Sequence, residues 1–304
     1  MLGGGTLLGC SLLFSPARPP AAWPPDLPPR VDLTAVPFFA QDEYQCGPAA
    51  LAIALGAAGV ERSPAQLVDQ VYLPERRGTL QPEMLAAARR AGLLAYPLAP
   101  DEASVLREVA AGHPVVILQN LRWDVYPQWH YAVVVGYDLT RDQRYLRSGV
   151  ERRRVMAGEE FERSWARAGR WAFVALPPER LPATATEADF VTAAAALERA
   201  STEAARRAYL AALVRWPDDL VARIGLGNVA YAGHRLDEAQ AQYQLAVEQH
   251  PGSADGWNNL AQTLHELGRD AEARRAARRA VALGGARLDE YRATLRAIPD
   301  GERP

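Results

Sequence analysis

Cysteine is scarce in this chain, because only Cys10 and Cys46 are present among 304 residues. No run of 18 apolar residues occurs, so the sequence predicts no helix that spans a membrane. The net charge of −2 argues against nucleic acid as the main partner, since phosphate binding needs a surplus of positive charge. We also find neither a metal-ligand cluster nor a Gly-rich nucleotide loop, and we therefore expect no cofactor.

The N-terminal residues are typical of an exported, tethered protein. Residues 16–29 hold seven prolines, which indicates an extended spacer, assigned to residues 11–30. Before it, the sequence LLGC at residues 7–10 resembles a bacterial lipobox. That resemblance implies a lipoprotein signal segment over residues 1–10, lipid on Cys10, and membrane contact through this anchor only. Ser11 after the cysteine favours the outer membrane, so we expect a cell-envelope protein facing the periplasm.

Two alternatives to this interpretation stay open. The apolar stretch before Cys10 is short and carries no basic residue, so either the true start lies upstream or the lipobox resemblance is accidental. An oxidising periplasm would also permit a disulfide between Cys10 and Cys46. We favour the lipid, because such a disulfide would join a flexible tether to the start of a helix for little gain in stability.

Residues 31–180 alternate between helical and strand patterns. Helical spacing predicts an Ala-rich helix after Cys46, a second that begins with Ser63 as N-cap and Pro64, and two more that end at Gly92 and Gly112. β-rich runs bounded by turn residues predict strands in LLAYPL, HPVVILQN, HYAVVVGYD, QRYLRS and RWAFVAL. Helices followed by a mostly antiparallel sheet indicate an α+β domain.

From residue 186 to residue 304 the pattern is helical only, with a repeat of 34 residues. Ala205, Ala239 and Ala273 keep this interval, as do Tyr209 and Tyr243. This is the period of tetratricopeptide repeats, in which small residues lie where paired helices approach closely. We predict three repeats, at about 186–219, 220–253 and 254–287, followed by a capping helix. Such an all-α solenoid is expected to bind a protein partner.

Cys46 has the features of a nucleophile at a helix start. Gly47 and Pro48 follow it directly and begin the Ala-rich helix, where free N–H groups and the helix dipole favour a thiolate. We therefore expect a lowered pKa for the Cys46 thiol. Gln41, five residues earlier, could donate an N–H to an oxyanion together with the backbone of Cys46.

His130 is the candidate base for this thiol. Three of the five histidines lie in the repeats, and His113 lies at a turn between a helix and a strand. His130 instead opens the strand HYAVVVGY after an aromatic loop. A histidine at the mouth of a strand, facing a cysteine at a helix start, is the arrangement of papain-like enzymes.

The motif QDEYQCGPAALA, followed by HYAVVVGYD, resembles the bacteriocin-processing, double-glycine-leader type of papain-like cysteine peptidase. With the lipobox and the repeats, the chain resembles a group of bacterial lipoproteins that carry such a domain. The resemblance implies a papain-like α+β fold over residues 31–180, with Cys46 as nucleophile, His130 as general base and acid, and Gln41 as oxyanion donor.

One departure from this family concerns the carboxylate that orients the histidine. Its members place an Asp at the end of the strand after the histidine, whereas this strand ends in YLRSG. Asp138 lies about 26 Å along an extended strand from His130 and is expected to cap the turn instead. Ser148, by a neutral hydrogen bond, and Glu151, the nearest carboxylate in sequence, remain the alternatives for orienting the ring.

The leading hypothesis is a cell-envelope cysteine peptidase that cleaves a peptide or protein substrate. The alternatives are a weakly active or inactive peptide-binding adaptor, and an amidase or acyl transferase that passes the acyl group to another acceptor. Trp123, Tyr126 and Trp129, just before His130, could either line a substrate groove or anchor their loop on the core.

Overall fold

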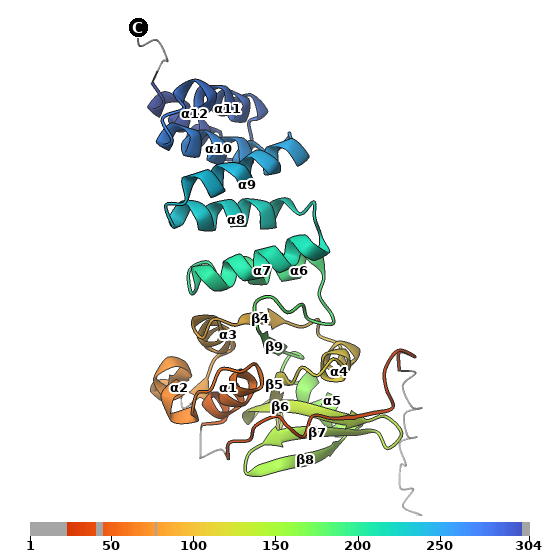
Figure 1. Ribbon diagram of the computed structural model, residues 1–304. Helices are drawn as coiled ribbons and strands as arrows, with labels where there is room; N and C mark the ends of the chain where they lie inside the picture. The colour runs from red at the N-terminus through yellow and green to blue at the C-terminus, as the bar shows by residue number, and fades with distance from the viewer. Residues whose placement is uncertain (1–22, 41–44, 77, 300–304) are drawn as a thin grey trace, which may run out of the picture.

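A computed structural model describes residues 23–40, 45–76 and 78–299 (Figure 1). It contains an α+β domain followed by a stack of helices that extends away from one edge of the sheet. Within these residues, no helix is both long enough and apolar enough to cross a bilayer.

The α+β domain is built on a seven-stranded antiparallel sheet. Its strands follow the order β4-β9-β5-β6-β7-β8, and β1 pairs with the C-terminal half of β6. The strands are β1 (Arg30–Asp32), β4 (Leu94–Pro97), β5 (Val115–Asn120), β6 (Trp129–Asp138), β7 (Gln143–Ser148), β8 (Glu151–Ala157) and β9 (Ala172–Leu176). A separate two-stranded hairpin is formed by β2 (Tyr72–Leu73) and β3 (Gly78–Thr79), which the short 3₁₀ helix η1 (Pro74–Arg76) connects.

Helices cover both faces of this sheet. One face carries α1 (Cys46–Ala57), α2 (Pro64–Val71) and α3 (Gln81–Arg90), and the other carries α4 (Glu102–Ala110) and α5 (Gly158–Ala166) (Figure 1). The strand β6 serves both layers, because Val133 and Val135 belong to the α1 core whereas Ala132 and Val134 belong to the core beneath α4. Its near-continuous run of apolar residues follows from this burial on two sides.

Local signals in the sequence set several of these helix ends. Ser63 and Gln66 form a reciprocal capping box at the start of α2, with Pro64 at the first helical position, as predicted. Asp101 caps α4 by accepting a hydrogen bond from the Ser104 N–H. Gly59 follows α1 with a φ of 85°, which a residue with a side chain adopts at a cost.

The helix α1 is buried on all sides. Its residues from Gly47 to Leu55 are all buried, and four of these nine are alanine, so neighbouring elements can approach its backbone closely. A Cβ atom at Gly47 would overlap with the side chain of Thr79 in β3. Small residues therefore place the first turn of α1 between the small hairpin and the sheet.

The second part of the chain is a run of paired helices. They are α6 (Glu187–Ala195), α7 (Thr202–Arg215), α8 (Leu220–Ala232), α9 (Leu236–Gln249), α10 (Ala254–Glu266), α11 (Asp270–Leu283) and α12 (Leu288–Ala297). The equivalent tyrosines Tyr209 and Tyr243 pack against Gly225 and Gly227 of α8, where a Cβ atom would overlap with either ring. Small residues thus lie where these helices meet, as the 34-residue repeat predicted.

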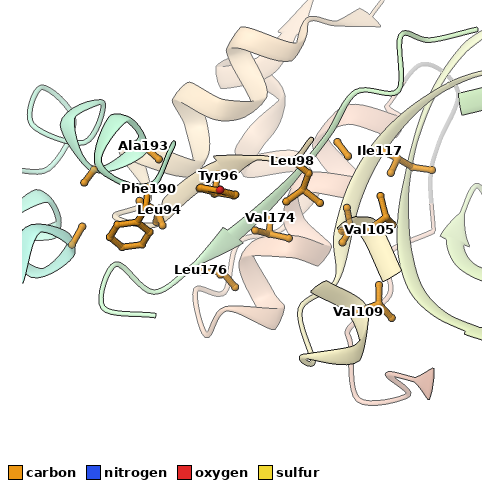
Figure 2. Close-up of a cluster of buried hydrophobic side chains, with 14 of the residues drawn as sticks. Leu94, Tyr96, Leu98, Val105, Val109, Ile117, Val174, Leu176, Phe190 and Ala193 are labelled. Carbon is orange, nitrogen blue, oxygen red and sulfur yellow. The ribbon is translucent and has the colours of Figure 1, made fainter. Parts of the chain in front are cut away.

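The two parts share one hydrophobic core. Phe190 of α6 belongs to the same buried cluster as Leu94 and Tyr96 of β4 and Val174 of β9 (Figure 2). The cluster continues through α7 and α8 as far as Val229. We call it the shared core; it means that the first helix pair packs directly on the edge of the sheet.

A buried carboxylate holds the connection between the two parts. Glu108 of α4 is fully buried and accepts hydrogen bonds from the backbone N–H groups of Ala183 and Thr184, at 3.2 and 2.7 Å. The His113 ring lies 2.7 Å from the same carboxylate. Burial raises the pKa of Glu108, but the hydrogen bonds from His113 and Thr184 outweigh this effect, so the pKa lies below its ordinary value.

Truncation of Phe190 tests whether the shared core couples the two parts. We expect Phe190→Ala to lower the free energy of unfolding by about 3–5 kcal/mol, because it removes a fully buried ring. The urea midpoints measured by far-UV circular dichroism and by tryptophan fluorescence should shift together. Val214→Ala on α7, an 85% exposed position, is the matched control and should stay within about 0.5 kcal/mol of the wild type. Loss of the repeats at lower urea, with the sheet domain unaffected, would contradict the coupling.

Candidate active site

Cys46 is the first residue of α1, with Gln45 at the N-cap position. The Gln45 side chain makes no capping hydrogen bond. The segment before α1 is held on the sheet by Arg147 of β7, whose guanidinium donates to the carbonyl oxygens of Thr34 and Val36 at 3.3 and 3.0 Å. This buried arginine ties residues 34 to 36 to β7.

The Cys46 thiol lies against the backbone of β6, at the residue that follows His130. The backbone N–H of Tyr131 lies near enough to the sulfur to lower the pKa of the thiol in part. The described pairing of β6 with β7 reaches only Val133, opposite Arg147, so this part of β6 extends past the end of β7. The start of α1 lies beside Tyr131 in this part of β6.

The His130 ring is oriented by Ser148. Its Nε2 atom lies 2.9 Å from the Ser148 hydroxyl oxygen at the end of β7. Ser148 is buried and His130 is half-buried. The sequence left Ser148 and Glu151 as alternatives for orienting the ring, and the structure shows Ser148 in contact with it. Because Nε2 is occupied, Nδ1 is the ring atom left to exchange a proton with a thiol.

Both candidate carboxylates are engaged elsewhere. Asp138 accepts hydrogen bonds from the Thr140 N–H and hydroxyl and from the Arg141 N–H, so it caps the β6–β7 turn as expected. Glu151 lies 4.0 Å from the guanidinium of Arg154 in β8. The charge that acts on His130 is that of Arg154, which is positive.

The pKa of Cys46 corrects one prediction. Burial raises the pKa of the thiol, and the backbone N–H groups of Tyr131, Gly47 and Cys46 itself only partly oppose this effect. We had expected the helix N-terminus to lower it. That expectation was wrong because it took the helix dipole into account but not the depth at which the first turn of α1 lies.

The pKa of His130 is also shifted, in the direction that favours the neutral ring. Burial, assisted by the positive charge of Arg154, lowers it to about 4. At neutral pH the site therefore contains a neutral thiol and a neutral imidazole. Among the described residues, no hydrogen bond joins the Cys46 sulfur directly to the His130 ring.

Two of the predicted site residues lie outside the described part of the chain. Gln41, the predicted oxyanion donor, and Cys10, the predicted lipid attachment site, both remain predictions. The described residues contain no group of His, Cys, Asp or Glu side chains arranged to hold a metal ion.

The aromatic residues before His130 do not anchor their loop on the core. Trp123 and Tyr126 are each 72% exposed, and Trp129 is 54% exposed. Anchoring is therefore wrong as an explanation of these side chains. A second feature, which the sequence did not indicate, is an open hollow of about 410 Å³ beside the start of α1. It is lined by Phe38, Phe39, Ala40, Gln45, Ala49, Ser63, Pro64 and Ala65.

Comparison with known proteins relates both parts of the chain to described families. Residues 33–173 match the model of the Peptidase_C39 like family. The first domain is similar to C39-like peptidases. Residues 190–254 and 224–302 match the tetratricopeptide repeat model. The predicted fold class, an α+β peptidase-like domain followed by tetratricopeptide repeats, is thereby confirmed.

One solved structure also shows a similarity to this chain. A crystal structure described as a C39-like peptidase from Bacillus anthracis is 20% identical to this chain, with a TM-score of 0.42. The similarity covers 48% of this chain and 97% of that one. The search of curated proteins gave no match. The resemblance to bacteriocin-processing peptidases in particular, and to lipoproteins, stays a prediction.

The raised pKa of Cys46 can be tested by alkylation. In a Cys10→Ala background, where Cys46 is the only thiol, the rate of reaction with iodoacetamide should rise steadily from pH 7 to pH 9, because only the thiolate reacts. His130→Ala should leave this profile unchanged, since a neutral imidazole does not stabilise a thiolate. A rate that already reaches its plateau below pH 7 would show an ion pair and contradict the neutral site.

Proposed function

We propose that the first domain is a cysteine peptidase in which Cys46 attacks a peptide carbonyl and His130 acts as general base and acid. The observation that supports this best is the position of the Cys46 sulfur beside the backbone of the strand residue that follows His130, together with the Ser148 hydroxyl 2.9 Å from the Nε2 atom of the imidazole. A base at the nucleophile and a third group behind the base are the parts of a catalytic triad.

The proposed reaction begins from the neutral pair. His130 Nδ1 accepts the thiol proton as the sulfur attacks the carbonyl carbon, so the imidazolium forms only as the new bond forms. The tetrahedral intermediate then expels the amine, which takes the proton back from His130. Water, deprotonated by the same ring, hydrolyses the acyl-enzyme. This sequence does not need a preformed thiolate, which burial disfavours here.

The start of α1 provides donors for the oxyanion. The first backbone N–H groups of a helix have no partner within it, and Cys46 occupies that position. We propose that the Cys46 N–H stabilises the negative oxygen, with the Gln41 side chain as second donor.

The remaining parts of the proposal concern location and partners. We infer a cell-envelope protein, held at the membrane by lipid on Cys10, whose tetratricopeptide repeats bind a protein partner or the substrate itself. The shared core would then hold any protein bound near α6 in a constant position relative to Cys46, because α6 packs directly against β4.

A non-catalytic, peptide-binding adaptor is the second candidate, and one observation favours it. The hydroxyl of Ser148 can either donate to Nε2 or accept from it, so it does not fix the tautomer of His130, whereas a carboxylate only accepts. A ring whose Nδ1 carries the proton cannot act as base toward Cys46. The choice between enzyme and adaptor therefore depends on how often the productive tautomer is present.

Product analysis tests the proposed activity directly. We expect the full chain to cleave members of a mixed decapeptide library at pH 7, with new amino termini detected by mass spectrometry. Cys46→Ala should abolish cleavage, because the acyl-enzyme cannot form. Addition of a primary amine should not divert the acyl group, whereas amide products would identify a transferase. Absence of cleavage would leave the adaptor as the function of this domain.

Replacement of Ser148 tests its role in orienting the ring. Ser148→Asp should raise kcat/KM about tenfold, because a carboxylate holds the productive tautomer and stabilises the imidazolium in the transition state. Ser148→Ala should lower kcat/KM up to about tenfold through loss of one hydrogen bond. Steady-state assays across the pH range provide the measurement, with thermal unfolding as a control for folding.

The pH profile gives a further check on the same group. In the wild type, activity should fall only as pH drops through the His130 pKa of about 4, because the base is neutral above that value. Ser148→Asp should move this acid limb upward, since a negative neighbour favours the protonated ring. An acid limb that stays in place in Ser148→Asp would exclude direct contact between residue 148 and the base.

A further inference from the structure

Four large apolar side chains project into solvent from the loop between β5 and β6 and from the first residue of β6. They are Trp123, Val125, Tyr126 and Trp129, and we call residues 121–129 the aromatic loop. Val125 is 80% exposed, more than any of the three aromatic residues. Several large apolar side chains exposed together on one short stretch of a folded domain usually mark an interaction surface.

The backbone of the aromatic loop is held in place although its side chains are free. The buried Asn120 side chain accepts hydrogen bonds from the N–H groups of Arg122 and Gln128, at 3.1 and 3.0 Å. Leu121 donates to the Gln128 carbonyl at 2.9 Å, and Tyr126 donates to the Trp123 carbonyl at 3.2 Å. A ligand that binds here therefore meets aromatic rings carried on a backbone that is already fixed, which reduces the entropy lost on binding.

The aromatic loop is continuous with the candidate active site. Trp129 immediately precedes His130 in β6, and it shares a face of that strand with Tyr131, two residues further on. The Tyr131 N–H contacts the Cys46 sulfur. A peptide chain placed with its carbonyl carbon at this sulfur would have a neighbouring side chain beside Trp129.

We propose that the aromatic loop binds a large apolar side chain of the peptide substrate, aromatic or branched aliphatic, next to the bond that Cys46 attacks. The proposal rests on the peptide-binding site inferred above and names the class of peptide that it accepts. Burying apolar surface between aromatic rings provides the binding free energy, and the fixed loop determines the position of the peptide relative to the thiol.

The charges of the loop favour a peptide over a lipid surface. Asp124 lies at its tip, between Trp123 and Val125, and is exposed like its neighbours. Insertion of this tip into a bilayer would remove the carboxylate from water at a high cost. Arg122 is the only basic residue in the loop, too little positive charge for strong attraction to anionic lipids.

Peptide binding to an inactive variant tests the proposal. The full chain carrying Cys46→Ala would be titrated against dye-labelled decapeptides of Gly and Ser that carry one central Phe, Leu, Ala or Glu, with fluorescence anisotropy as the readout. We expect the Phe and Leu peptides to bind about tenfold more tightly than the Ala and Glu peptides. Trp129→Ala, a change at an exposed position, should remove that preference, and Trp129→Phe should keep most of it.

Matched controls separate the possible results. Val214→Ala removes an exposed apolar side chain from α7 and should leave all peptide affinities unchanged. Equal affinity for the four peptides, or an unchanged preference in Trp129→Ala, overturns the proposal. So does co-sedimentation with phosphatidylglycerol vesicles that is lost in Trp129→Ala while the peptides are not distinguished, because the loop would then bind lipid.

This experiment is independent of turnover. Preference for Phe and Leu peptides, together with an absence of cleavage by the wild-type chain, would contradict the peptidase activity alone and leave the binding site in place. Cleavage of all four peptides at one rate, without preferential binding, would contradict only the role of the aromatic loop.

Discussion

The complete burial of α1 is the constraint on which the candidate site depends. This helix packs against β6 on one side and against a small hairpin on the other, and Gly47 lies so close to Thr79 that even an added Cβ atom would overlap with it. Its first residue is thereby fixed beside the strand residue that follows His130. The same burial raises the pKa of the thiol that it positions. The burial of α1 therefore determines both where the Cys46 thiol lies and how high its pKa is.

The polar groups behind His130 are consistent with that neutral site. A carboxylate at position 148 would favour a charged imidazolium, whereas burial and the positive charge of Arg154 favour the uncharged ring that contacts Ser148. Because the thiol and the imidazole are both neutral, no ion pair between them stabilises the site before substrate binds. Proton transfer from the thiol to the imidazole becomes favourable only when the sulfur can attack a substrate carbonyl. The proposed chemistry therefore depends more on substrate binding than it does in a site with a preformed thiolate.

Much of this architecture could be predicted from sequence, because it follows from local patterns. The 34-residue spacing predicted the helix pairs, and turn residues delimited β5, β6, β7 and β9. The helix α5 was missed, since its few apolar residues, such as Phe161 and Trp165, lie among charged ones. The pKa of Cys46 and the exposure of Trp123 could not be predicted, because both depend on contacts between segments distant in the sequence. Packing of Phe190 against β4 was missed for the same reason.

The shared core has a consequence for how such a chain can be divided. Recombination or proteolysis between β9 and α6 would leave Leu94, Tyr96 and Val174 facing water, next to a sheet edge that no longer has a cover. The freed domain would then be prone to aggregation, and the repeats would lose the surface against which their first helix folds. Although two family models divide this sequence, inheritance of the first domain alone would require new polar residues on β4.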